Sequence, residues 1–321
     1  MAAPVRIKAL ALVAAVFPAV LHAQAYPAKP IRILVGFTPG AGVDIAMRLI
    51  APKMGEALGQ QIVIDNRPGA GGNIAAELGA RAPSDGYTLF AAGAPAAISQ
   101  TLYPKLSYDL LKDFEAIALV ASVSQLLVVH PSLPARTVKD FVAIAKSRRG
   151  ELTYASTGSG STPHLTAEML RMQTGIDIVH VPYRGTPPAL TDLVAGNVTF
   201  MFANVLSVLP QVQGGRLRAL AITTAKRSAI TPNLPTVAET YPGFESGSWY
   251  ALVAPAGTPK EAVMRLHDAV KRAMQSPEVR EKFVAQGAEP LSGTPQDAAA
   301  YMRAEVAKWG KVVKASGARV E

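Results

Sequence analysis

The sequence predicts an α/β protein of two domains joined by strands that cross between them. Three observations support this: short β-branched runs alternate with segments of helical periodicity, Gly-rich loops follow the runs, and two apolar segments suit crossing strands. The length of 321 residues fits two domains of about 150 residues each. Because 49% of the residues are hydrophobic and only 17% are charged, a disordered or fibrous chain is excluded.

The first part of the chain repeats a strand–loop–helix unit. Strands are expected where apolar runs are short and rich in β-branched residues, at 31–37, 61–65 and 87–91. Helices are expected where apolar residues recur with helical spacing, at 44–58 and 74–82. The stretch AGAP at 92–95 is expected to be the loop that ends the third strand.

The second part follows the same plan. Strands are expected at 152–156, 177–182, 198–202 and 217–223, and helices at 137–147, 164–173 and 188–195. Three further helices, at 260–275, 277–286 and 295–315, close the molecule.

Two long apolar segments are expected to connect the domains. The run 118–129 has Ser122, Ser124 and Gln125 in its middle, which suits a strand that leaves one sheet and enters another. The run 249–254 suits a strand that carries the chain back. The predicted division is 26–122 and 248–321 for domain 1 and 123–247 for domain 2.

The first 25 residues have the pattern of a secretory signal peptide. Arg6 and Lys8 precede an apolar run of thirteen residues, and Ala23-Gln24-Ala25 supplies small residues at a cleavage site. Crossing a bilayer as a helix takes about 20 apolar residues. We therefore expect cleavage between Ala25 and Tyr26 and a periplasmic protein, with an uncleaved anchor or a buried helix as the alternative.

The sequence lacks the residues and motifs that several classes of enzymes and metal-binding proteins need. Cysteine is absent, and the five histidines form no pair at metal-ligand spacing. Ile45 stands where the dinucleotide-binding pattern GxGxxG would have its third glycine, and GxxxxGK[ST] and GxSxG do not occur. No cofactor, no metal and no enzymatic activity are expected. Nucleic acid binding is disfavoured, because the net charge of +9 is spread along the chain.

Three Gly-rich loops follow predicted strands and open predicted helices. They are 38–42, 67–73 and 157–161. At such positions backbone N–H groups and the positive end of the helix dipole favour carboxylate or phosphate oxygens, and the crevice beyond the strand ends is where α/β sheets bind ligands. The loops therefore predict binding of a small anionic solute. The alternative is that they are ordinary turns.

Several residues near these loops have a structural interpretation, and most of them also have a functional one. Asp44 and Arg48 are spaced for a surface ion pair. His164, at a helix start, is either a structural or capping residue or a ligand contact. Tyr183 and Arg184 follow a strand and face either the crevice or the solvent. Of Trp249 and Tyr250, alternation places one in the core and leaves the other for the ligand or the hinge.

Motifs over essentially the whole mature chain resemble the Bug-type solute receptors of tripartite tricarboxylate transporters. The matching stretches include YPAKPIRILVGFTPGAGVD at 26–44, IDNRPGAGGNIAAE at 64–77, YASTGSGSTPHLTAEML at 154–170 and VHVPYRGTPPALTDLVAGNV at 179–198. The resemblance implies a periplasmic binding protein of type II, the Venus flytrap fold. It also implies a monomer that binds a small carboxylate between its lobes and delivers it to a membrane permease.

The resemblance also implies a set of ligand-binding residues. Together with the neighbours singled out above, the predicted set is Phe37, Thr38, Gly40, Ala41, Gly42, Gly93, Ala94, Pro95, Ser156, Thr157, Gly158, His164, Tyr183, Arg184, Ala203, Asn204 and Trp249. This chain has Ala203 and Asn204 where the family commonly has an Asp, which disfavours an amino-acid ammonium. Ala41 stands where the family usually has a glycine and Val43 where it usually has a hydroxyl residue, and the less polar pocket that results is compatible with an aromatic acid.

Two other functions stay open at this point. The same receptor could report its ligand to a sensor kinase, since both roles need the same closed surface. A periplasmic hydrolase or isomerase is a remote third interpretation.

Overall fold

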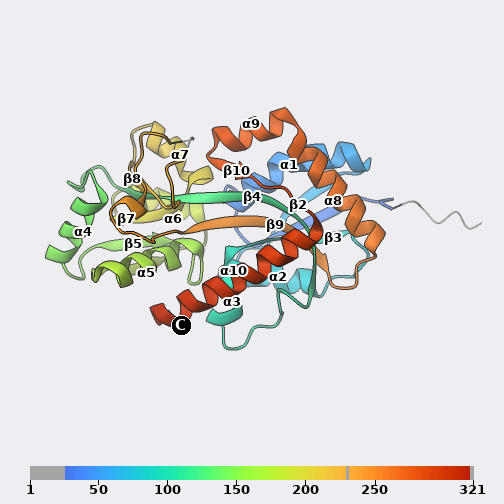
Figure 1. Cartoon of the computed structure of the whole chain (residues 1–321), viewed down its shortest axis with the longest axis horizontal. Helices are drawn as coiled ribbons and strands as arrows, with labels where there is room; N and C mark the ends of the chain where they lie inside the picture. Colours follow the sequence, from blue (N-terminus) through green and yellow to red (C-terminus); the bar gives the residue numbers. More distant parts are fainter. Residues whose placement is uncertain (1–25, 229–230, 319–321) are drawn as a thin grey trace, which may run out of the picture.

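The computed structural model describes residues 26–228 and 231–318 (Figure 1). The predicted signal peptide and its cleavage site lie outside these residues. None of the helices within the described part of the chain combines the length and the apolar character needed to cross a membrane.

The first lobe is built on a mixed sheet of six strands, one of them the short β10 (Ala288–Pro290). Strands β1 (Ile31–Val35), β2 (Ile62–Asn66) and β3 (Thr88–Gly93) are parallel, while β9 (Gly247–Pro255) runs antiparallel between β3 and β4 (Phe114–Val129). Helices cover both faces of the central strands, whereas β2 at the edge is only partly buried. Ile31, Ile33 and Val35 pack in one core cluster with α1 (Gly42–Leu58) and α8 (Lys260–Gln275). Leu34 packs in a second cluster with α3 (Ala94–Leu102) and α10 (Pro295–Ser316), while Arg32 is exposed.

The second lobe has its own smaller sheet. Strands β5 (Thr153–Ser156), β6 (Val179–Pro182) and β7 (Phe200–Asn204) are parallel, and β7 and β8 (Arg218–Ile222) pair antiparallel with the end of β4. The remaining elements of this lobe are α4 (Val138–Ser147), α5 (Thr162–Thr174), α6 (Thr186–Val194), α7 (Val205–Gln213) and the short η2 (Val237–Glu239).

Strand β4 belongs to both lobes. It pairs with β9 from Phe114 to Ser124 and with β7 and β8 from Gln125 to Val129. This confirms the expected change of sheet near Ser122–Gln125, and β9 starts beside the same point, with Gly247 opposite Ser124. The domain boundaries at 122/123 and 247/248 stay a prediction that this pairing supports.

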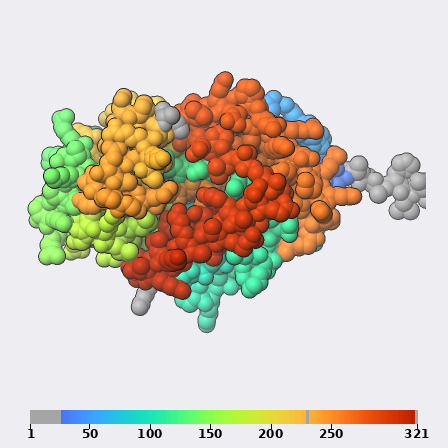
Figure 2. All heavy atoms as spheres, in the orientation of Figure 1, coloured from blue at the N-terminus to red at the C-terminus, as the bar shows by residue number. Residues whose placement is uncertain are grey.

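Helix α10 makes a further connection between the lobes. It packs along α3 of the first lobe, and its end reaches α5, where an Arg171 guanidinium nitrogen donates to the Ser316 carbonyl at 3.3 Å. In Figure 2 its surface (red) runs from the first lobe to the light-green surface of α5. Helices α2 (Asn73–Ala80) and α9 (Pro277–Ala285), the short η1 (Ala70–Gly72) and strand β10 (Ala288–Pro290), which pairs with β4, complete the fold.

Two helices differ from the expectation. The stretch 92–95 was expected to be a loop, but α3 starts at Ala94 directly after β3. Pro95 stands in the first turn of α3, where its missing N–H breaks no helical hydrogen bond. It is therefore compatible with a helix that starts at Ala94. Helix α7 was not expected, and it contains Pro210.

Candidate ligand-binding site

A cavity lies where the two lobes meet. It holds about 690 Å³ of empty space, part of it open to solvent. Its lining residues come from both lobes: Gly36, Phe37, Ala41, Gly42, Val43, Gly71, Gly72, Phe90, Ala91, Gly93, Pro95, Ala96, Gln125, Thr157, Thr162, Pro163, Thr186, Met201, Asn204, Ser248 and Tyr250.

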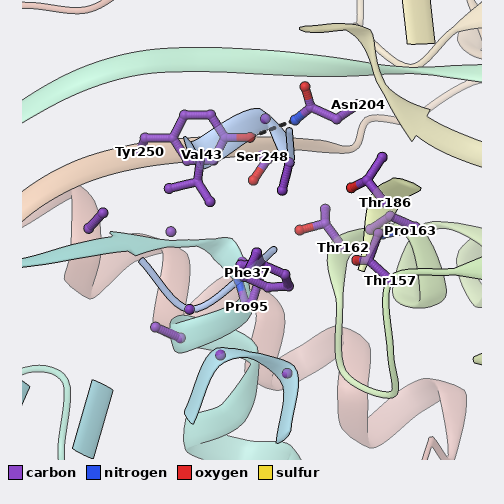
Figure 3. A pocket seen from close by; sticks show the side chains of 18 of the residues that line it. Phe37, Val43, Pro95, Thr157, Thr162, Pro163, Thr186, Asn204, Ser248 and Tyr250 are labelled. Carbon is purple, nitrogen blue, oxygen red and sulfur yellow. Dashed lines mark hydrogen bonds between the residues drawn. The ribbon is translucent and has the colours of Figure 1, made fainter. Parts of the chain in front are cut away.

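The two walls of the cavity differ in polarity. In Figure 3, Phe37, Val43 and Pro95 of the first lobe lie across from Thr157, Thr162 and Thr186 of the second. None of the lining residues, all within the described chain, is Asp, Glu, Lys, Arg or His. A charged ligand therefore has to be held by backbone groups, hydroxyls and amides.

Six helices of the described chain begin at this cavity. Gly42, Thr162 and Thr186, the first residues of α1, α5 and α6, line it, and so do Gly72 before α2, Pro95 in the first turn of α3 and Asn204 before α7. Among these six helices α7 is capped by the Asn204 side chain, and the other five have no side-chain cap. Uncapped starts also occur away from the cavity, at α8 and α9. An uncapped start leaves N–H groups without a helical partner next to the positive end of the helix dipole. These starts make the cavity receptive to anions.

Asn204 and Tyr250 join the lobes at the cavity wall. The Asn204 side-chain oxygen accepts the Leu206 N–H at 3.1 Å and so fixes which way the amide points. The amide nitrogen then donates to the Tyr250 hydroxyl at 2.7 Å (Figure 3). Burial raises the pKa of Tyr250, so the phenol stays protonated. A carboxylate at position 204 would lack this donor.

Asp44 anchors the first loop of the cavity. It is only 2% exposed, and its carboxylate accepts from the Gly40 N–H at 2.9 Å, the Arg48 guanidinium at 3.0 Å and the Asn66 amide at 2.9 Å. Asn66 also donates to the Phe37 carbonyl. Burial alone would raise the pKa of Asp44, but these donors together lower it. The expected i,i+4 ion pair with Arg48 is present, but it is not a surface pair, because Asp44 is buried and anchors the loop.

Stacked rings anchor the second loop. His164 lies against His180 with centroids 4.1 Å apart, and Tyr154 stacks on the other face of this pair at 4.8 Å from His180. The Gly160 N–H donates to His164 Nδ1 at 3.1 Å, and Ser156 Oγ lies 2.6 Å from His180 Nε2. Burial lowers the pKa of both histidines to about 4, so both are neutral at pH 7.

The structure brings part of the predicted set to the cavity wall. The predicted residues that line it are Phe37, Ala41, Gly42, Gly93, Pro95, Thr157 and Asn204. Those that do not are Thr38, Gly40, Ala94, Ser156, Gly158, His164, Tyr183, Arg184, Ala203 and Trp249. Ligand contact of the first group stays a prediction.

Residues of the second group have other surroundings. Gly40, Ser156 and His164 serve the loop anchors described above. Thr38 lies against Gly185 of the other lobe, Gly158 hydrogen-bonds Ser156, and Ala94 and Ala203 are buried in the cores. The Tyr183 hydroxyl donates to Asp192 at 2.7 Å, and Arg184 is exposed outside the cavity.

Alternation placed one of Trp249 and Tyr250 in the core and the other at the ligand or the hinge, and the predicted set named Trp249; in the structure Tyr250 is the cavity residue. The Trp249 indole is buried and donates to Glu305 at 2.8 Å, while Tyr250 lines the cavity. Alternation along β9 implied one residue of each kind, but only the neighbouring strands decide which side faces the cavity. Sequence reasoning also missed Gln125, Thr162, Thr186, Met201 and Ser248 as lining residues.

Comparisons with known proteins agree on one group of relatives. A family model described as tripartite tricarboxylate transporter family receptor matches residues 46–318. Protein BugT of Bordetella pertussis is 37% identical over 304 residues, covering 94% of this chain and 93% of BugT. R. palustris Rpa4515 with adipate has a TM-score of 0.89 at 40% identity, covering 92% of this chain and all of the other (100%). MatC of Rhodopseudomonas palustris with bound malate has a TM-score of 0.84 at 33% identity, covering 90% of this chain and 100% of MatC.

Proposed function

Because this chain belongs to the tripartite tricarboxylate transporter receptor family, we propose that its cavity binds a small carboxylate for delivery to a membrane permease. The observation that carries the proposal is the ring of five uncapped helix starts around a cavity without charged side chains. Backbone N–H groups at such starts hold carboxylate oxygens without a basic residue.

The side chains that line the cavity favour some classes of carboxylate over others. Phe37, Val43, Met201 and Phe90 give the cavity apolar surface, which favours a ligand with an unsubstituted carbon chain or an aromatic ring. The absence of Asp and Glu among the described lining residues leaves an ammonium group without a counter-ion. A dicarboxylate or an aromatic acid thus fits better than an amino acid, and the adipate and malate bound by two relatives are small dicarboxylates.

The route to the membrane follows from the same family. Residues 1–25 direct export and are removed between Ala25 and Tyr26, so the protein acts in the periplasm. There it acts as a monomeric receptor and not as an enzyme. Its closed form, with Asn204 bonded to Tyr250 across the lobes, is the form that the permease recognises.

Gly42 offers a direct test of the site. A Cβ at this position would lie 2.6 Å from both Asn204 Oδ1 and Tyr250 Oη, so Gly42→Ala forces this pair apart. The test measures the melting temperature and the calorimetric affinity of residues 26–321 with adipate, malate, citrate, benzoate and glutamate. For the wild type, a carboxylate at about 100 times its Kd raises the melting temperature by roughly 5–10 °C.

We expect Gly42→Ala to weaken that binding by at least about tenfold. The control is Gly310→Ala in α10, where the new Cβ meets only a Thr101 hydroxyl at 3.0 Å. Equal affinities of the two variants would contradict the proposed site. A wild-type response to glutamate alone would overturn the ligand class.

A further inference from the structure

Four buried polar side chains meet where β4 passes from one sheet to the other. They are Gln125 on β4, Thr166 on α5, Thr223 after β8 and Ser246 before β9, each no more than 3% exposed. Buried polar groups are costly unless they are paired, so such a cluster is retained for a reason.

Thr223 ties together the two segments that connect the lobes. Its hydroxyl lies 3.0 Å from the Gln125 N–H and 2.7 Å from the Ser246 carbonyl oxygen. Its backbone N–H donates to the Gln125 carbonyl, and its own carbonyl accepts the Ser246 N–H, both at 3.0 Å. The hinge backbone is therefore fully paired at this point, and only side chains are left to respond to a ligand.

The Gln125 side chain is held at one end only. Its oxygen accepts from the Thr166 hydroxyl at 2.5 Å, and that hydroxyl also contacts the Ser246 hydroxyl at 2.5 Å. Its amide nitrogen has no hydrogen bond to any residue in the ranges 26–228 and 231–318. Gln125 is only 1% exposed and yet lines the cavity. This leaves a nearly buried, unpartnered donor at the cavity wall.

We propose that the Gln125 amide donates to a carboxylate oxygen of the ligand. The inference rests on the proposed function of the cavity. Since Thr166 occupies the Gln125 oxygen, the amide presents only N–H groups, which pair with an acceptor such as a carboxylate and not with an ammonium. Gln125 pairs with β7 of the second lobe, and Thr166 lies on α5 of the same lobe, so Thr166 aims the donor from within the second lobe.

The test compares Gln125→Met, which keeps the length of the side chain but removes the donor, with the wild type. Isothermal titration with adipate at pH 7 gives the affinity, and urea unfolding gives the stability. A hydrogen bond to a charged group corresponds to roughly 10- to 150-fold in affinity, and we expect a loss in this range. Gln125→Glu, which places a negative charge at the same point, is expected to lose more.

The control is Gln100→Met on α3. Unlike Gln125, Gln100 uses both ends of its amide, bonding to the Ala96 carbonyl and the Leu110 N–H, and it lies outside the cavity lining. We expect this variant to lose stability and keep its adipate affinity. A second variant, Thr166→Val, keeps the Gln125 amide but removes the bond that orients it, and is expected to weaken adipate by a smaller factor than Gln125→Met.

Each outcome decides between the two proposals. If the wild type binds adipate and Gln125→Met binds it within twofold of the wild type, Gln125 is only a structural hinge residue and the inference is overturned. If Gln125→Glu binds better than the wild type, the amide presents its oxygen and the assignment is reversed. If the wild type binds none of the carboxylates, the proposed function fails and the inference falls with it.

Discussion

The two loops that face each other across the cavity both lead into uncapped helix starts, but different kinds of side chain hold them in place. The loop of residues 37–42 and the loop of residues 157–161 each lead into an uncapped helix, α1 and α5. The first is anchored by the ionised carboxylate of Asp44. The second is anchored by the neutral, stacked rings of His164 and His180.

This difference gives the lobes different responses to acid. The donors around Asp44 lower its pKa, so the first anchor keeps its charge in mild acid. The histidines must stay neutral to keep the second anchor, and their pKa values of about 4 lie below the ordinary value of 6.5. A binding site can thus hold one wall rigid while the other loosens as protons bind.

Removing the carboxylate of the first anchor has the largest expected effect. Asp44→Ala frees the Gly40 N–H and leaves the Arg48 and Asn66 donors without their shared acceptor. We expect the free energy of unfolding to fall by about 3 kcal/mol and adipate affinity to fall by more than about tenfold, measured by urea unfolding and calorimetry. The control is Glu56→Ala on the same helix, whose exposed pair with Lys53 stabilises by less than about 1 kcal/mol. Similar losses in both variants would show that Asp44 is no special anchor.

Acid is expected to weaken the second anchor next. Between pH 6.5 and 4, His164 and His180 become protonated in the unfolded chain but stay neutral in the folded chain. The free energy of unfolding that they contribute is therefore fully present above pH 6.5 and falls as the pH drops. We expect a loss of about 2 kcal/mol over this window, measured by urea unfolding at several pH values. Hydrogen exchange should locate the loosening at residues 157–161 and not at 37–42.

The double variant His164→Gln/His180→Gln serves as the control for the pH effect. It lacks the two groups that titrate, so its stability should change less over the same window. An unchanged slope, or faster exchange at 37–42 than at 157–161, would contradict the contrast between the loops.

The smallest effect is expected from Ser156→Ala. It removes the 2.6 Å contact with His180 Nε2 inside the buried stack, and we expect a loss of about 1 kcal/mol, or 2–4 °C in melting temperature. Ser132→Ala is a matched control, because Ser132 Oγ makes a 2.7 Å contact with His130 Nδ1 on the surface. Equal melting temperatures for the two variants would show that Ser156 does not stabilise the histidine stack.

Sequence patterns predicted the framework and part of the site. Apolar runs located the strands, and the serines and Gln125 within 118–129 indicated where β4 changes sheets, because a polar break inside an apolar strand marks a change of surroundings. The Gly-rich loops indicated Gly42 and Thr157, since a glycine after a strand permits a close backbone approach. These signals are local, and each can be read within a few residues.

The rest depends on contacts between distant residues. Gln125 is a cavity residue because Thr166, forty-one positions later, holds its oxygen. Tyr250 replaces Trp249 at the cavity because Glu305 pairs with the indole on the other side of β9. Asp44 has local partners in Gly40 and Arg48, but it also accepts from Asn66, twenty-two positions later. No local pattern contains these distant partners.

The place of β9 also governs the order in which the chain can fold. The second sheet is complete once residue 222 has been made, whereas the first sheet lacks the strand between β3 and β4 until residues 247–255 arrive. Until then the facing edges of β3 and β4 have no partner. Pairing between segments so far apart in the sequence is slow. The first lobe therefore closes only when most of the chain is available.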